Sequence, residues 1–111
     1  MKSKVKKSPK EIQKRLKEIS EVVERVIKEE KLEKNIKSVS VFGSVVRGEE
    51  TKDSDIDFFV EFLEPLGLSF FTFQIKLEDN FSKKVDLGTK NSLDPYLKKN
   101  IINSSIKIYE R

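Results

Sequence analysis

The amino-acid sequence predicts an α+β fold in which helices pack on a small mixed β-sheet. Three observations support this prediction. Residues 9–30 carry apolar side chains at helical spacing, residues 38–42 and 55–62 carry them at the alternating spacing of strands, and both kinds of segment then recur to the C-terminus. The resulting order, α-β-α-β-α-β-α-β, indicates helices that cover a sheet.

The first helix has a well-defined beginning. Ser8 is a typical N-cap residue, Pro9 suits the first helical position, and Glu11 at the third position completes a capping box. Helical spacing up to about Glu30 is kept by Ile12, Leu16, Ile19, Val22, Val23, Val26 and Ile27. The basic tail that precedes the helix, residues 1–8, is expected to be mobile.

Four strands are predicted. The segment 38–42 places Val39 and Val41 on one face, and shorter strands are expected at 84–88 and 106–109. In the segment 55–62, two sets of side chains alternate: Ile56, Phe58, Val60 and Phe62 on one face, and Asp55, Asp57, Phe59 and Glu61 on the other.

Two further helices are predicted in the C-terminal half. Residues 68–83 are rich in aromatic side chains, but the segment is too long for an ordinary strand, which favours a core-packed helix. Asp94 is expected to cap a last helix that begins at Pro95 and runs to about Asn103. No repeat or internal linker interrupts the chain, so a single domain over residues 1–111 is expected.

The composition excludes several kinds of chemistry. The chain has no Cys and no His, so it cannot form a disulfide framework, a Cys/His zinc site or a catalytic triad that needs His. Catalysis must therefore use carboxylates, hydroxyls, Lys, Arg or Tyr. A hard cation with oxygen ligands suits such a set of side chains.

The charge distribution argues against nucleic acid as a partner. The net charge is +4, but the first ten residues hold five Lys and no acid, whereas the remainder carries 18 basic and 19 acidic residues. The body of the protein is thus nearly neutral. No apolar run is long enough to span a bilayer, and the N-terminus lacks a hydrophobic signal core, so a cytoplasmic protein without a membrane partner is expected.

Asp55 and Asp57 are the first candidate functional residues. Alternate residues of a strand project from one face, so both carboxylates are expected to point the same way. Two carboxylates so close together repel each other unless a cation neutralises them. A pair of Mg²⁺ ions would do so, and such pairs clamp the attacking and leaving oxygens of phosphoryl and nucleotidyl transfer.

Gly43 and Ser44 are the second candidates. A Gly directly after a strand allows a ligand to approach the backbone closely. A short helix is expected from Ser44 to Arg47, where Gly48 ends it, and the free N–H groups at its start favour a phosphate group. A triphosphate with Mg²⁺ needs both kinds of site side by side.

These motifs resemble a known family. Gly43-Ser44, followed after ten residues by Asp55-x-Asp57, is similar to the motif of the polymerase-β-like nucleotidyltransferase superfamily. The closer resemblance is to the minimal nucleotidyltransferases, the MNT-type antitoxins that are paired with HEPN-domain toxins. Arg47-Gly48 and Val85-Asp86-Leu87 also stand where that family places them. The resemblance covers Val39 to the C-terminus and implies a nucleotidyltransferase fold.

The resemblance also implies roles for the acidic residues. Asp55 and Asp57 correspond to residues that bind both metal ions. Asp86 corresponds to a third carboxylate, which binds the catalytic metal and helps to lower the pKa of the acceptor hydroxyl. Attack on the α-phosphorus of the nucleotide then releases pyrophosphate.

The nucleotide-binding residues implied by the resemblance are Gly43, Ser44 and Arg47. Ser44 and the Gly43 region correspond to the groups that hold the β- and γ-phosphates. Many relatives have a basic residue directly after Gly-Ser, but here that position is Val45. The triphosphate contacts are therefore expected to depend more on Arg47, Ser44 and backbone N–H groups.

The function implied by the resemblance is transfer of AMP from ATP to a tyrosine hydroxyl of a cognate HEPN ribonuclease toxin, which is thereby silenced. Two alternatives remain open. The protein could neutralise its partner by binding alone, with an idle nucleotide site, or it could transfer a nucleotide to a small molecule or RNA. The last is the least favoured, because the chain lacks the extra helical domain or basic surface that such enzymes usually carry.

Overall fold

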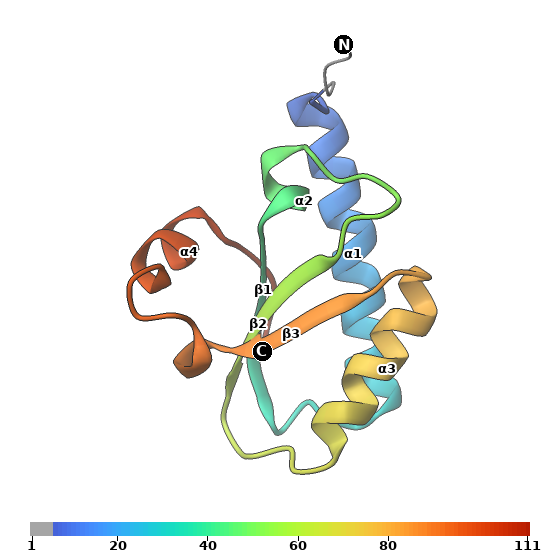
Figure 1. Ribbon diagram of the computed structural model, residues 1–111. Coiled ribbons are helices and arrows are strands. Elements are labelled where there is room, and N and C mark those ends of the chain that lie inside the picture. Colours follow the sequence, from blue (N-terminus) through green and yellow to red (C-terminus); the bar gives the residue numbers. More distant parts are fainter. Residues whose placement is uncertain (1–5) are drawn as a thin grey trace.

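The computed structural model describes residues 6–111 (Figure 1). Its helices and strands largely follow the predicted order, with one added 3₁₀ turn. They are α1 (Pro9–Glu29), β1 (Ile36–Phe42), α2 (Ser44–Arg47), β2 (Ile56–Phe62), α3 (Ser69–Phe81), β3 (Val85–Thr89), η1 (Lys90–Ser92), α4 (Lys98–Ser104) and β4 (Ile106–Glu110).

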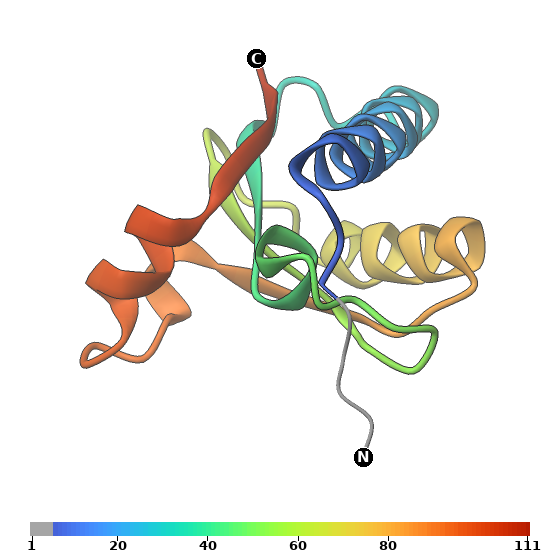
Figure 2. The same cartoon turned by 90° about the horizontal axis from the view of Figure 1, so that it is seen from above.

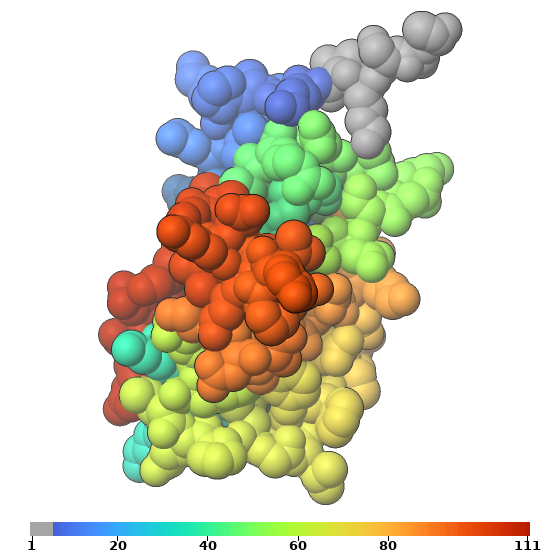
Figure 3. Space-filling model, turned by 60° about the vertical axis from the view of Figure 1, so that its left-hand side comes forward, coloured from blue at the N-terminus to red at the C-terminus, as the bar shows by residue number. Residues whose placement is uncertain are grey.

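The four strands form one mixed sheet in the order β3-β2-β1-β4. The pair β2–β3 is parallel, and β1 is antiparallel to both of its neighbours. Helices α1 and α3 cover one face of the sheet, and α4 lies on the opposite side (Figures 1 and 2). Figure 3 shows that opposite side, where the orange and red segment around α4 lies beside the green segment around α2. The predicted α+β class is therefore confirmed.

The hydrophobic core lies between the sheet and the two covering helices. Helix α1 contributes four fully buried side chains, Ile19, Val23, Val26 and Ile27. From β2, Phe58 packs against Phe81 at the end of α3, with ring centroids 6.2 Å apart. The face of β2 that the sequence predicted from Ile56, Phe58 and Val60 is thus the face that packs in the core.

Helix α1 begins as the sequence predicts. The Ser8 hydroxyl accepts a hydrogen bond from the Glu11 N–H, and the Glu11 carboxylate accepts one from the Ser8 N–H. This reciprocal pair satisfies N–H groups that would otherwise lack a partner at the helix start.

Helix α4 begins later than predicted. The sequence places its start at Pro95, whereas the helix begins at Lys98. The Asp94 side chain accepts a hydrogen bond from the Tyr96 N–H, and its carbonyl accepts one from the Leu97 N–H. Asp94 therefore stabilises a turn that precedes the helix instead of capping the helix itself.

The basic tail lies only partly within the described residues. Residues 1–5 of the segment predicted to be mobile lie outside them. The Lys7 N–H donates to the Gly48 carbonyl at 2.9 Å, and Lys6 lies 3.9 Å from Glu49. Residues 6 and 7 are thus held against the turn after α2. Over the described range, none of the helices has the length and apolarity needed to cross a bilayer.

Candidate active site

Two of the three predicted carboxylates stand side by side on neighbouring strands. Asp57 on β2 pairs with Asp86 on β3 in the parallel ladder. Paired residues of adjacent strands project from the same face. Ile56 and Phe58, which flank Asp57, are buried under α1 and α3, so the two carboxylates project from the opposite face, the one on which α4 lies.

Gly43 brings the first motif against the second. It follows Phe42, which pairs with Asp57 across the β1–β2 ladder. Gly43 has a φ of +80°, a conformation that L-residues rarely adopt, and a Cβ added there would overlap the Asp57 Oδ2 atom. The Gly43 backbone therefore lies against the Asp57 carboxylate, so the two motifs meet at one place in the fold.

The pKa of Asp57 is strongly shifted. Partial burial, followed by repulsion from Asp86 and Asp55, raises it from 3.8 to about 6, although the positive charge of Arg47 opposes the shift. The causes of this shift show that Asp55, Asp86 and Arg47 all act electrostatically on the same carboxyl group. A divalent cation beside Asp57 would offset the cost of burying its charge and would neutralise the repulsion.

The other predicted residues surround this centre. Asp55 lies one residue before the start of β2 and is partly buried. Ser44 is the first residue of α2, directly after Gly43. Arg47 is the last residue of α2, and its Nε donates to a Glu49 carboxylate oxygen at 2.9 Å.

The acidic side chains do not form a closed cluster. Within residues 6–111, no three acidic side chains come close enough together to make a preformed metal site. The parallel ladder nevertheless places Asp57 beside Asp86, so these two are the acidic residues that the described backbone brings together.

Two residues of α3 that the sequence did not single out hold the backbone of Val85, which directly precedes Asp86. Strand β3 is an edge strand, so the backbone of Val85 has one side without a strand partner. Gln74 donates to the Val85 carbonyl at 2.9 Å, and Glu78 accepts from the Val85 N–H at 3.0 Å. Their four-residue spacing on a largely apolar helix is the only signal that the sequence offers.

Glu50 is a third residue that sequence reasoning missed. It lies in the loop between α2 and β2, and its side chain is only 7% exposed. Burial by itself would raise the pKa of Glu50, but hydrogen bonds from Arg15 and Lys83 outweigh that effect and hold the pKa below its ordinary value. Glu50 is therefore a paired anion next to the segment that carries Asp55.

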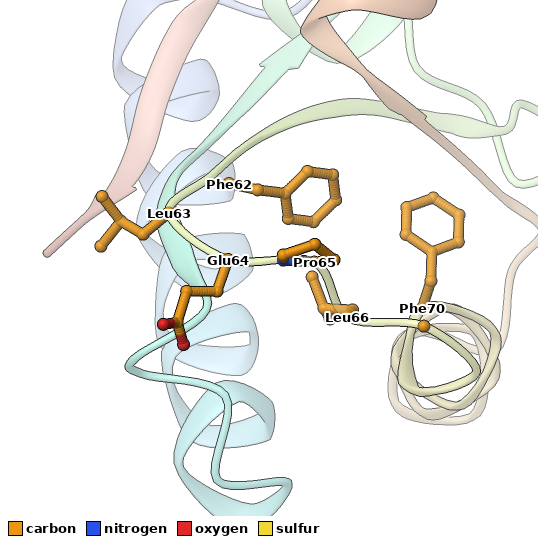
Figure 4. A pocket seen from close by; sticks show the side chains of 7 residues that line it. Phe62, Leu63, Glu64, Pro65, Leu66 and Phe70 are labelled. Carbon is orange, nitrogen blue, oxygen red and sulfur yellow. The ribbon is translucent and has the colours of Figure 1, made fainter.

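A separate apolar pocket lies between the end of β2 and the start of α3 (Figure 4). Its volume is about 330 Å³, and the rings of Phe62 and Phe70, 6.2 Å apart, form part of its wall. The one acidic residue that lines it, Glu64, points away from these rings in Figure 4. The pocket therefore lacks the converging polar groups of a reaction site.

Comparisons with known proteins agree with this geometry. Residues 21–111 match the family model "Polymerase beta, Nucleotidyltransferase". The chain is 41% identical over 97 residues to a Methanocaldococcus jannaschii protein named "Putative protein adenylyltransferase MJ0126", with 86% of this chain and 99% of that protein covered. It is 34% identical over 94 residues to the "Protein adenylyltransferase MntA" of Thermococcus cleftensis, with 84% and 95% covered.

Solved structures share the fold. A tri-AMPylated Shewanella oneidensis HEPN toxin in complex with its MNT antitoxin contains a chain that superposes with a TM-score of 0.63 at 16% identity, covering 86% of this chain and 73% of that one. At 16% identity, this match shows a shared fold and nothing more. The resemblance seen in the motifs is therefore confirmed, and the chain belongs to the polymerase-β nucleotidyltransferase family, as an enzyme of its minimal, MNT-type group.

Proposed function

We propose that the protein is a Mg²⁺-dependent adenylyltransferase that transfers AMP from ATP to a tyrosine hydroxyl of a cognate HEPN ribonuclease toxin. The observation that carries this proposal is the in-register pair of Asp57 and Asp86 with Gly43 packed against the Asp57 carboxylate. The names of the adenylyltransferase relatives support AMP as the transferred group. The AMPylated HEPN toxin of the Shewanella complex supports the class of acceptor.

The residues present suit magnesium. Asp55, Asp57 and Asp86 offer only carboxylate oxygens, which are the ligands that Mg²⁺ prefers. Burial first, and the neighbouring Asp86 and Asp55 second, raise the pKa of Asp57, and a divalent cation would favour its ionised form. When bound, the cation would stabilise the charge that develops on the phosphates and favour the ionised form of the acceptor hydroxyl.

The chain's own groups position the nucleotide. Gly43 allows the triphosphate to approach the backbone without a Cβ in the way, and the Ser44 hydroxyl adds a hydrogen-bond donor. Arg47 stands at the far end of the same short helix and would pair with a phosphate oxygen in exchange for part of its contact with Glu49.

The proposed reaction is a single displacement at phosphorus. The tyrosine oxygen forms a bond to the α-phosphorus of ATP, and the bond from that phosphorus to the bridging oxygen of the β-phosphate breaks. Pyrophosphate leaves with the bonding electron pair. The phenol proton passes to the carboxylate of Asp86 or to water, and the products are AMP-tyrosine and pyrophosphate.

The surroundings of the site suit a protein acceptor. The segment that leads into α4 lies on the same side of the sheet as the carboxylates. It presents Tyr96 and Leu97, which are 94% and 51% exposed. Exposed apolar groups on the same side of the sheet as the carboxylates favour contact with a macromolecule, which would bring its own hydroxyl to the nucleotide.

The test combines the purified protein with Mg²⁺, ATP labelled at the α-phosphorus, and a cognate HEPN toxin. We expect label and the mass of AMP on the toxin, at a tyrosine whose change to Phe prevents the reaction. The Asp57→Asn variant should leave the toxin unlabelled. Intact wild-type protein that leaves the toxin without label would contradict the proposal.

Binding alone is the competing explanation, in which the antitoxin blocks its partner and the nucleotide site is idle. Expression of Asp57→Asn with the toxin in cells separates the two. If catalysis matters, the variant should bind the toxin but fail to restore growth. Full protection by a variant that transfers no AMP would favour binding.

A further inference from the structure

The side chain of Glu50 joins three parts of the molecule. The Arg15 guanidinium of α1 donates to both carboxylate oxygens, with Nε and Nη2 each 2.9 Å away. The Lys83 Nζ, from the turn before β3, lies 2.6 Å from Oε2. The Glu50 and Lys83 side chains are 7% and 10% exposed, so this ion pair is shielded from solvent. We call Glu50, Arg15 and Lys83 the clasp.

The backbone beside Glu50 is held as well. Lys83 also donates to the Thr51 carbonyl at 2.8 Å, and Lys7 donates to the Glu50 carbonyl at 2.9 Å. The Arg15 guanidinium in turn lies over the Phe81 ring, 5.8 Å from its centroid. The first half of the loop between α2 and β2 is therefore fixed on several sides.

The clasp connects the two segments that deliver the carboxylates. Glu50 lies five residues before Asp55 on one segment, and Lys83 lies three residues before Asp86 on the other. Between these points, the Ile56 N–H donates to the Lys84 carbonyl at 3.1 Å and begins the parallel ladder. A movement of either end of the clasp would change the spacing of the acidic residues.

We propose that Glu50 is a positioning residue, which acts through Lys83 and Arg15 to hold Asp55 and Asp57 at a fixed separation from Asp86 for cation binding. This inference rests on the metal-dependent activity proposed above. Buried ion pairs often add little to stability compared with an apolar replacement. Fixing the relative position of two metal-ligand segments is a role that an apolar replacement could not fill with the same geometry.

The test compares Glu50→Gln, Lys83→Met and the double variant. Glu18→Gln is the matched control, because Glu18 contacts the same Arg15 guanidinium from the solvent side, with a side chain 52% exposed, and lies outside the clasp. Glu50→Gln keeps the shape of the side chain and removes its charge. Melting temperatures are measured first, and all other assays are done well below the lowest of them.

Three readouts separate positioning from stability: Mn²⁺ affinity by electron paramagnetic resonance without nucleotide, amide hydrogen exchange at residues 50–57 and 84–86, and the kcat and KM of AMP transfer. We expect the Mn²⁺ Kd to rise about tenfold and kcat to fall about tenfold in Glu50→Gln and Lys83→Met, with a KM for ATP within about twofold of wild type. Exchange should become faster in both segments.

The double variant should be no worse than the worse single variant, because both changes break one clasp. A lower melting temperature with Mn²⁺ affinity and kcat unchanged would overturn the proposal and leave Glu50 a purely structural role. If the wild-type protein binds Mn²⁺ but transfers no AMP to the toxin, the proposed function fails. The Mn²⁺ affinity and hydrogen-exchange measurements would still show whether the clasp positions the acidic residues.

Discussion

Asp57 on β2 and Asp86 on β3 are direct partners in the parallel ladder, which places two acidic side chains next to each other on one face of the sheet. Gly43, directly after β1, borders the same site, because its backbone lies against the Asp57 carboxylate. The end of β1 and the neighbouring strands β2 and β3 thus contribute Gly43, Asp57 and Asp86 to one acidic centre, although these residues are far apart in the sequence.

Removal of either carboxylate should abolish catalysis without unfolding the protein. We expect Asp57→Asn and Asp86→Asn each to lower the rate of AMP transfer by roughly 10³-fold, because each is a proposed metal ligand whose loss would remove several kcal/mol of charge stabilisation. The measurement is the initial rate with labelled ATP, with circular dichroism to verify the fold. Asp79→Asn on the exposed surface of α3 is the control and should keep the wild-type rate.

The Asp57→Asn change should stabilise the metal-free protein at neutral pH. The folded pKa of Asp57, about 6, exceeds its ordinary value of 3.8, so the folded state binds more protons between these values. The free energy of unfolding therefore falls as the pH rises from about 4 to about 6. Because the group is half-exposed, we expect Asp57→Asn to gain only about 1 kcal/mol, less than the full shift would give.

Urea unfolding with EDTA at pH 7.5 and at pH 4 would measure this gain. It should be present at pH 7.5 and should vanish near pH 4, where the Asp57 carboxyl is protonated in the folded state. An equal gain at both pH values would assign the effect to packing rather than to charge.

Cation affinity should depend on pH through the same group. Protonation of Asp57 competes with metal binding, so the apparent Mn²⁺ Kd in the absence of nucleotide should be nearly constant above pH 7 and rise by about tenfold per pH unit below about pH 6. Titration followed by electron paramagnetic resonance would show it. A flat profile from pH 5 to pH 8 would mean that Asp57 is not a ligand.

Gly43 and Gly67 offer a matched pair of substitutions. Both have positive φ, +80° and +59°, so an Ala at either position should be strained, and more so at Gly43, whose ψ of −143° lies near a region that is essentially restricted to Gly. A Cβ at Gly43 overlaps the Asp57 carboxylate, whereas a Cβ at Gly67 meets nothing within 4 Å. We expect Gly43→Ala to lose about 100-fold in AMP transfer rate and Gly67→Ala to keep it.

Thermal unfolding and initial rates of the two Ala variants would decide this prediction. A rate defect confined to Gly43→Ala, measured at a temperature at which both variants are folded, would assign the close approach to the site. Equal rate defects would instead point to general strain.

Arg47 should affect the nucleotide more than the chemistry. Its guanidinium is largely exposed, with a side chain 59% accessible, so a phosphate oxygen could reach it. We expect Arg47→Ala to raise the KM for ATP about tenfold, because a charge-assisted hydrogen bond is lost. Arg25→Ala, on the surface of α1, is the control. A lower kcat with unchanged KM would give Arg47 a different role.

Local sequence signals predicted much of the fold. The Ser8 and Glu11 capping box set the start of α1, and alternation in β2 selected the core face that includes Phe58. The error at α4 arose because Asp94 and Pro95 suit both a helix start and a tight turn. The competition between these structures depends on hydrogen bonds to the next two residues, which the residue types alone do not decide.

The site was predicted in part for a similar reason. Asp55 and Asp57 lie two residues apart, which placed them near each other, but β2 begins only at Ile56, so the strand alternation that predicted a shared direction does not extend to Asp55. The pairing of Asp57 with Asp86 depends on a strand crossover through α3, whose register no local pattern specifies. Glu50 and Lys83 come together over a separation of 33 residues, so their contact was not accessible from the sequence either.

The most direct test of the central claim is a crystal structure of the wild-type protein with Mn²⁺ and a non-hydrolysable ATP analogue, with anomalous diffraction to locate the metal. We expect a Mn²⁺ peak about 2.1 to 2.2 Å from carboxylate oxygens of both Asp57 and Asp86, beside the phosphates at Gly43. A nucleotide bound with its metal away from these two side chains, or an Asp86 carboxylate turned away from the metal, would contradict it.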